Sequence, residues 1–136
     1  VPEALPRFMP AFASFEQWLQ TNARNRNIIA EAELLKNDFK PAAYFPEETV
    51  IELQGLYADL DHEYQRTRAL EDVVKTTAQI LVLQIKRFQN TLATSDEIIA
   101  ALAALYAAKA RALTTLYTYH SYALDAELIF ESLKKK

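Results

Sequence analysis

The sequence predicts an all-α protein, an elongated antiparallel bundle of three long helices with coiled-coil packing. Helix-breaking residues are rare, because the chain has one Gly and five Pro, the last of them Pro46. A sheet protein needs frequent turns rich in Gly, Pro, Asn and Asp, so this composition argues against sheets. Hydrophobic residues make up 51% of the 136 residues, enough for one domain with a modest core. We expect an irregular leader over residues 1–13 and a single helical domain over residues 14–136.

The first helix is expected over residues 14–40. Ser14 and Gln17 have the spacing of a capping box, in which two backbone N–H groups at a helix start are satisfied reciprocally. The first apolar patch follows at once, with Phe15, Trp18 and Leu19. The polar segment 20–27 leaves open whether this is one helix with a weak middle or two shorter helices. Pro41 then ends the helical pattern, because Pro does not fit a helix interior.

The second helix is expected over residues 47–92, and its heptad pattern is regular. Its first turn carries Glu47 and Glu48, which favour the positive end of the helix dipole. One heptad column consists of Val50, Tyr57, Tyr64, Glu71, Ala78, Ile85 and Leu92. The column three residues further on consists of Leu53, Leu60, Thr67, Val74, Leu81 and Phe88. A seam that stays in phase over this length is typical of a coiled coil.

The third helix is expected over residues 95–134. Thr94 and Glu97 again have capping-box spacing and mark its start. Its apolar arc is wide, since neighbouring columns are apolar too, among them Ile99, Tyr106 and Leu113. Such an arc needs cover from more than one side, so the first helix or a second subunit must contribute.

Composition and motifs exclude several classes of function. The net charge is −3 and the one basic cluster is the tail 134–136, so a nucleic-acid surface is not expected. The longest uncharged stretch, residues 112–124, is shorter than the roughly 20 apolar residues of a membrane span. The chain has no Cys, and its single Gly rules out a Gly-rich phosphate loop.

The two histidines do not complete a catalytic or metal site. His62 shares a helix face with Asp59, but a di-iron site needs a second such pair and further carboxylates. His120 stands beside Ser121 in sequence, which does not make the two side chains face each other, and a partly buried His with a satisfied hydrogen bond is expected there. We therefore expect no enzyme activity, no cofactor and no metal.

A tyrosine cluster on the third helix allows a different function. Its members, which could line a ligand pocket or belong to the core, are Tyr106, Tyr117, Tyr119 and Tyr122. A pocket would indicate an extracytoplasmic helical-bundle sensor or ligand-binding domain, and this alternative stays open.

The segment 87–128 carries a pattern of spaced motifs. Phe88 is followed by a Thr/Ser turn, by Glu97 with Ile98 and Ile99, by a Leu/Ala run and by Tyr117-Thr118-Tyr119. This pattern resembles the helical hairpin of the TolC-like outer-membrane efflux proteins, and segment 15–40 is similar to that family's opening helix. The family's turn Gly is absent, and Thr91 occupies its place. The resemblance is confined to the helical part, because the strands of the family's β-barrel have no counterpart here.

The resemblance implies a non-enzymatic, periplasmic interaction protein that acts through helix-helix contacts. Its partner would be a second copy of the chain or an adaptor with a helical hairpin, and no membrane span is expected in this chain. The implied partner-binding residues lie at the hairpin tip: Phe88, Asn90, Thr91, Leu92, Thr94 and Glu97.

Overall fold

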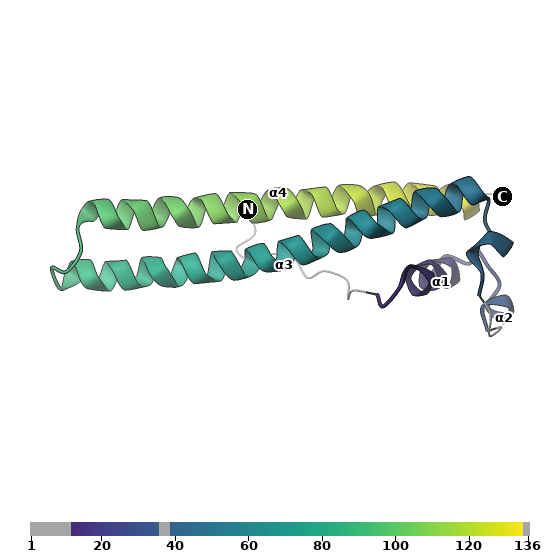
Figure 1. Cartoon of the computed structure of the whole chain (residues 1–136), viewed down its shortest axis with the longest axis horizontal. Coiled ribbons are helices and arrows are strands. Elements are labelled where there is room, and N and C mark those ends of the chain that lie inside the picture. The colour runs from purple at the N-terminus through teal and green to yellow at the C-terminus, as the bar shows by residue number, and fades with distance from the viewer. Residues whose placement is uncertain (1–11, 36–38, 135–136) are drawn as a thin grey trace. The chain divides into compact units, whose positions relative to one another are not determined.

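The computed structural model describes residues 12–35 and 39–134, and its regular structure is entirely helical (Figure 1). The elements are α1 (Phe15–Asn25), α2 (Glu31–Leu34), the 3-10 helix η1 (Pro41–Ala43), α3 (Glu47–Gln89) and α4 (Ser95–Lys134). The all-α class is thus confirmed for the described part of the chain. α4 has the predicted bounds, and α3 ends at Gln89 rather than at residue 92.

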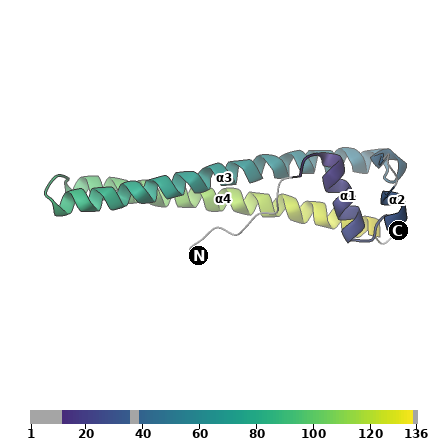
Figure 2. The ribbon, with the colours of Figure 1, turned by 90° about the horizontal axis from the view of Figure 1, so that it is seen from below.

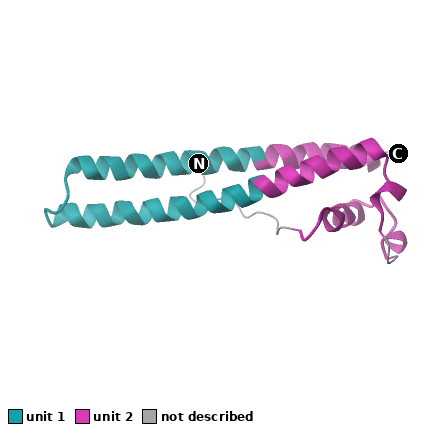
Figure 3. Cartoon of the chain, viewed as in Figure 1, with its two compact units in different colours: residues 1–7, 63–118 teal, residues 8–62, 119–136 magenta. Residues whose placement is uncertain are grey.

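The described residues fall into two compact units (Figure 3). Unit 1 contains residues 63–118, which are the second part of α3, the α3–α4 turn and the first part of α4. Unit 2 contains the described residues from 12 to 62 together with residues 119–134, and so includes α1, α2 and η1. The expectation of a single domain stays a prediction.

The predicted first helix over residues 14–40 is wrong, because α1 ends at Asn25. The chain leaves the helix through Asn27, whose φ of 56° lies in the left-handed region that Asn tolerates better than most residues. Two hydrogen bonds close this end in the Schellman pattern: Ile28 N donates to Ala23 O at 2.9 Å and Asn27 N to Arg24 O at 3.2 Å. Two shorter helices replace one long one, and a bundle of three long helices is not confirmed.

Unit 2 is built around aromatic side chains on three helices. Trp18 of α1 is 4% exposed, and its ring lies 5.5 Å from that of Tyr57 on α3 and 5.5 Å from that of Phe130 on α4. Tyr57 donates a hydrogen bond of 3.1 Å to the carbonyl oxygen of Phe12, which holds the segment before α1. The predicted cap is confirmed, since the Ser14 hydroxyl accepts from Gln17 N at 3.2 Å. Buried apolar area from α1, α3 and α4 therefore stabilises this unit.

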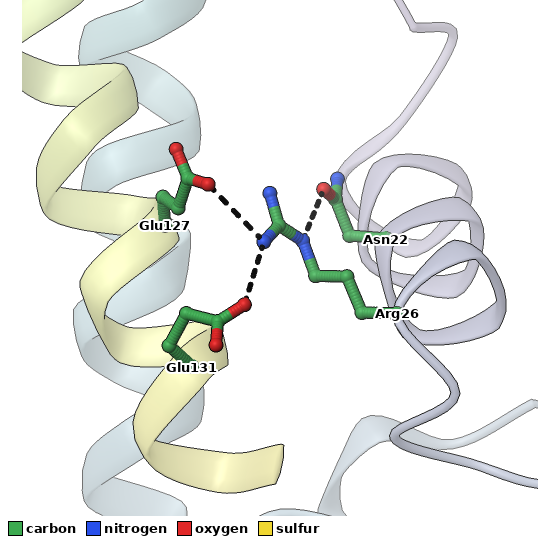
Figure 4. A network of polar contacts seen from close by, with 4 residues as sticks. All are labelled: Asn22, Arg26, Glu127 and Glu131. Atoms are coloured by element: carbon green, nitrogen blue, oxygen red, sulfur yellow. Dashed lines mark hydrogen bonds and ion pairs between the residues drawn. The ribbon is translucent and has the colours of Figure 1, made fainter.

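Arg26 adds polar contacts between the end of α1 and α4 (Figure 4). Its guanidinium lies 5.2 Å from the ring centroid of Phe130 and forms ion pairs of 3.8 Å with Glu127 and 3.6 Å with Glu131. Asn22 accepts a further hydrogen bond of 3.5 Å from Arg26 Nε. The side chain thus combines a cation–π contact with two partly exposed ion pairs.

Unit 1 is an antiparallel pair of helical segments joined by a short turn (Figures 2 and 3). Thr67 and Leu70 of α3 are buried, and so is a regular stripe of α4, consisting of Ala101, Leu105, Ala108, Ala112, Thr115 and Leu116. The second predicted heptad column, which contains Thr67, therefore faces inward. The first column lies at the flank of the seam instead, since Glu71 and Ala78 are half-buried and Ile85 is 39% exposed.

Candidate partner-binding hairpin

The turn between α3 and α4 is closed by backbone hydrogen bonds. Leu92 N donates to Arg87 O at 2.7 Å, and Thr91 N donates to Phe88 O at 3.0 Å, which together form a Schellman motif. Thr91 occupies the left-handed position with φ 59°, a conformation that favours glycine and disfavours a β-branched residue. The Arg87 side chain donates to Leu92 O at 3.2 Å and so satisfies another carbonyl of the turn. The tight turn therefore forms without a glycine, at the cost of a strained Thr91.

Thr94 caps the start of α4, as the sequence predicts. Thr94 Oγ1 accepts a hydrogen bond of 3.3 Å from Glu97 N, and Thr94 O accepts from Ile98 N at 3.3 Å. Asp96 and Glu97 lie in the first turn of the helix, where negative charge is favourable. This cap fixes the direction in which α4 leaves the turn.

All six predicted partner-binding residues are exposed and gather at the turn of unit 1. Phe88 and Leu92 are the apolar ones, with 46% and 66% of their surface exposed. The polar ones are Asn90, Thr91, Thr94 and Glu97. The structure therefore brings these residues to one end of the hairpin, and their role in binding stays a prediction.

The exposed apolar surface extends well beyond the predicted tip. None of residues 71–100 is buried, although this segment is rich in apolar side chains. The exposed ones that the prediction omitted are Val73, Ile80, Val82, Leu83, Ile85 and Ile99. A sequence signal exists for all of them except Val73, because residues 76–85 and 98–108 contain no charged side chain. Counted from the turn, these two uncharged stretches lie at the same level of the hairpin.

The predicted tyrosine cluster is divided between the two units. Tyr106 and Tyr117 are 62% and 63% exposed in unit 1, whereas Tyr119 is 8% exposed and lies in unit 2 with Tyr122. His120 is exposed rather than partly buried, with its ring edge-on to Tyr119 at 5.6 Å. Among the described residues, no group of three His, Asp or Glu side chains is placed to hold a metal ion.

By length and composition alone, α4 would be able to cross a membrane. Only 22% of its most apolar stretch is buried in the structure, so the apolar character of this helix is mostly exposed. The expectation that the chain contains no membrane span stays a prediction. No family model, curated protein or solved structure matches the chain.

Proposed function

We propose that this chain is a non-enzymatic interaction protein whose unit 1 hairpin binds other helices through its apolar surface. The observation that carries the proposal is the absence of any buried residue over 71–100, where Val82, Leu83, Phe88, Leu92 and Ile99 remain exposed. Contiguous exposed apolar side chains on a soluble protein usually mark an interaction site, since leaving them in water is unfavourable. Helices bury such surface by packing against other helices.

The compartment and the partner in this proposal come from the resemblance to the TolC-like efflux proteins. The helical part of those proteins is periplasmic, and its hairpin tip meets the helical hairpin of an adaptor. By analogy, the tip residues Phe88 and Leu92 make apolar contacts with the partner, and Asn90, Thr94 and Glu97 surround them with polar groups. The tight turn supports this assignment, because Thr91 adopts the backbone conformation that a turn Gly would take.

A comparison of two substitutions tests the role of the tip. Leu92→Asp places a charge at the tip, and Ile51→Asp is the matched control, because Ile51 is 61% exposed and lies in unit 2. Binding to a purified adaptor hairpin of the TolC-like systems is measured by biolayer interferometry. We expect Leu92→Asp to weaken binding at least roughly tenfold, because a buried unpaired charge is costly, and Ile51→Asp to leave it unchanged. Binding that is absent in the unmodified chain, or lost equally in both variants, would contradict the proposal.

A further inference from the structure

The part of α4 in unit 1 carries a second apolar stripe beside the one that packs against α3. Ala101, Leu105 and Ala108 form the buried stripe. Leu102 and Tyr106 each follow a member of that stripe by one residue, so they lie together on one side of the helix. They are 37% and 62% exposed, so the described residues of unit 1 leave much of their apolar surface in water.

α3 contributes to the same side of the hairpin. Because the two helices run in opposite directions, residues that follow an inward-facing position by one lie on the same side of both helices. Val82 follows the half-buried Leu81 in this way and is 52% exposed. Val82 precedes the end of α3 by as many residues as Leu102 follows the start of α4, so the two lie at the same level. Together with Tyr106 they form an apolar surface that both helices share.

Three exposed lysines border this apolar surface. Lys75 and Lys109 each follow an inward-facing residue by one, so they lie on the same side of the hairpin as the apolar residues. Both are equally far from the turn along their helices, which puts two positive charges at one level. Lys86 lies nearer the turn, one helical turn after Val82. These residues form what we call the basic-apolar face, which consists of Lys75, Val82, Lys86, Leu102, Tyr106 and Lys109.

The hairpin is basic although the chain is acidic. Residues 73–118 contain five basic and two acidic side chains and so have a net charge of +3, whereas the whole chain carries −3. The two acids are Asp96 and Glu97, in the first turn of α4. Glu97 precedes the half-buried Ile98 by one and lies on the other side of the hairpin, and Asp96 points away from α3. Neither acid therefore belongs to the basic-apolar face.

The lysines of this face lack carboxylate partners. Glu71 and Asp72 lie about one turn beyond Lys75, away from the turn of the hairpin, and limit the face there. Among the described residues, the ion pairs that form are those of Arg26 in unit 2. Two like charges at one level and on one side of the hairpin repel each other, and an anion that contacts both removes this repulsion. Lys75 and Lys109 therefore favour an anionic partner.

We infer that the basic-apolar face binds the surface of a phospholipid bilayer that contains anionic lipids. The apolar side chains enter the boundary between headgroups and acyl chains, and the lysines contact the phosphates while their aliphatic stems lie along the apolar surface. Tyr106 suits this boundary, because its ring is apolar and its hydroxyl can bond to water or headgroups. The inference goes beyond the proposed function, since it adds a lipid partner on one side of the hairpin and leaves Phe88 and Leu92 to the protein partner.

The combination of positive charge and apolar bulk favours a lipid surface over other partners. A nucleic acid would contact the lysines but leave the apolar side chains in water. A second copy packed face to face would place lysine against lysine, because Lys75 and Lys109 lie at the same level. An anionic bilayer provides phosphates and an apolar interior next to each other, so it satisfies both kinds of side chain.

The length of the apolar surface indicates that the hairpin lies along the bilayer. α4 is apolar enough for lipid contact, and only 22% of its most apolar stretch is buried in the structure. The uncharged stretch 76–85 is about 15 Å long, roughly half of the hydrocarbon thickness of a bilayer. With Lys75 and Lys86 at its two ends, this stretch fits a position in the interface plane, where both lysines reach headgroups.

Co-flotation of the full chain with phospholipid vesicles tests this inference. The vesicles contain phosphatidylcholine with roughly one-third phosphatidylglycerol, whose negative charge attracts lysines, and vesicles of pure phosphatidylcholine are the lipid control. We expect binding to the anionic vesicles to be at least roughly tenfold tighter than to the control vesicles. Added salt should weaken it, because salt screens exposed charges.

Two pairs of variants separate this face from the rest of α4. Lys109→Gln and Arg111→Gln each remove one positive charge, but Arg111 precedes the buried Ala112 and lies on the other side of the hairpin. Lys109→Gln should weaken vesicle binding roughly fivefold, and Arg111→Gln less than roughly twofold. Tyr106→Ser should also weaken it roughly fivefold, whereas Ala107→Ser, at the next exposed position, should have little effect. Circular dichroism checks that all variants keep their helix content.

Several results would overturn the inference. They are an absence of binding to anionic vesicles, equal binding to both kinds of vesicle, and an effect of Arg111→Gln as large as that of Lys109→Gln. A dimer in lipid-free solution that Tyr106→Ser weakens, without vesicle binding, would assign the face to a second copy instead. A chain that binds an adaptor through Leu92 but no vesicles would overturn only the lipid partner, whereas one that binds vesicles but no adaptor would contradict only the adaptor part of the proposed function.

Discussion

Replacement of Thr91 by Gly should stabilise the hairpin, because Thr91 holds a left-handed backbone conformation with φ 59°. This conformation costs a non-glycine residue roughly 1–2 kcal/mol, since Cβ approaches a carbonyl oxygen. Gly removes this strain but loses more conformational freedom on folding, which costs roughly 0.5–1 kcal/mol. The Thr91 hydroxyl donates to Asn90 O at 2.6 Å in an exposed position, where water replaces the bond at little cost. The expected net gain in the free energy of unfolding is about 0.5–1 kcal/mol.

Urea unfolding followed by far-ultraviolet circular dichroism measures this gain. Thr91→Ala is the matched control, because it removes the hydroxyl and the β-branch but keeps Cβ and hence most of the strain. Thr91→Pro should destabilise the chain by about 3 kcal/mol or more, since Pro cannot reach a positive φ and cannot donate to Phe88 O. Measurements at two protein concentrations separate folding from self-association. The reasoning is refuted if Thr91→Gly is no more stable than Thr91→Ala.

Three further predictions concern unit 2. Trp18→Ala should cost about 3–5 kcal/mol of unfolding free energy by denaturant titration, because it empties a site that is 4% exposed, and a cost below about 1 kcal/mol would disagree with its packing. Arg26→Met should lower the free energy of unfolding by about 0.5–1.5 kcal/mol, because it removes the cation–π contact with Phe130. The double variant Glu127→Gln/Glu131→Gln should lower it by less than about 0.5 kcal/mol, because both acids are about half exposed. If the double variant loses more stability than Arg26→Met, the ion pairs of Arg26 contribute more than its contact with Phe130, and the prediction is wrong. Burial, together with the nearby acids Asp61 and Glu16, raises the pKa of Tyr57 above its ordinary value of 10.0. The stability that Tyr57 contributes is therefore present below pH 10 and is lost as pH rises through the raised pKa. Tyr57→Phe should therefore weaken the loss of stability above pH 10, and an unchanged alkaline profile would contradict this assignment.

The sequence by itself determined the helical class and most helix limits. The scarcity of Gly and Pro after Pro46, the cap at Thr94 and the glutamates at the start of α3 are local signals, and they act through backbone geometry within a few residues. The end of the second helix was predicted too late, at residue 92, because α3 ends at Gln89 and Thr91 already lies in the turn. The break after Asn25 was only one of two alternatives, since whether an Asn takes the left-handed conformation depends on the hydrogen bonds that close the helix end.

Only the tertiary structure decided which apolar stripes are buried. α3 has two apolar heptad columns, and its seam with α4 uses the column of Thr67 together with Leu70, which leaves Ile85 at the flank. Likewise, α4 has two apolar stripes, and packing against α3 buries the one with small residues at Ala101, Ala108 and Ala112. Small side chains let the two helices approach closely, whereas Tyr106 would hold them apart. Because a single partner helix covers only one face, the same packing choice leaves Ile99, Leu102 and Tyr106 exposed, and exposed apolar surface of this kind is the basis of the proposed function.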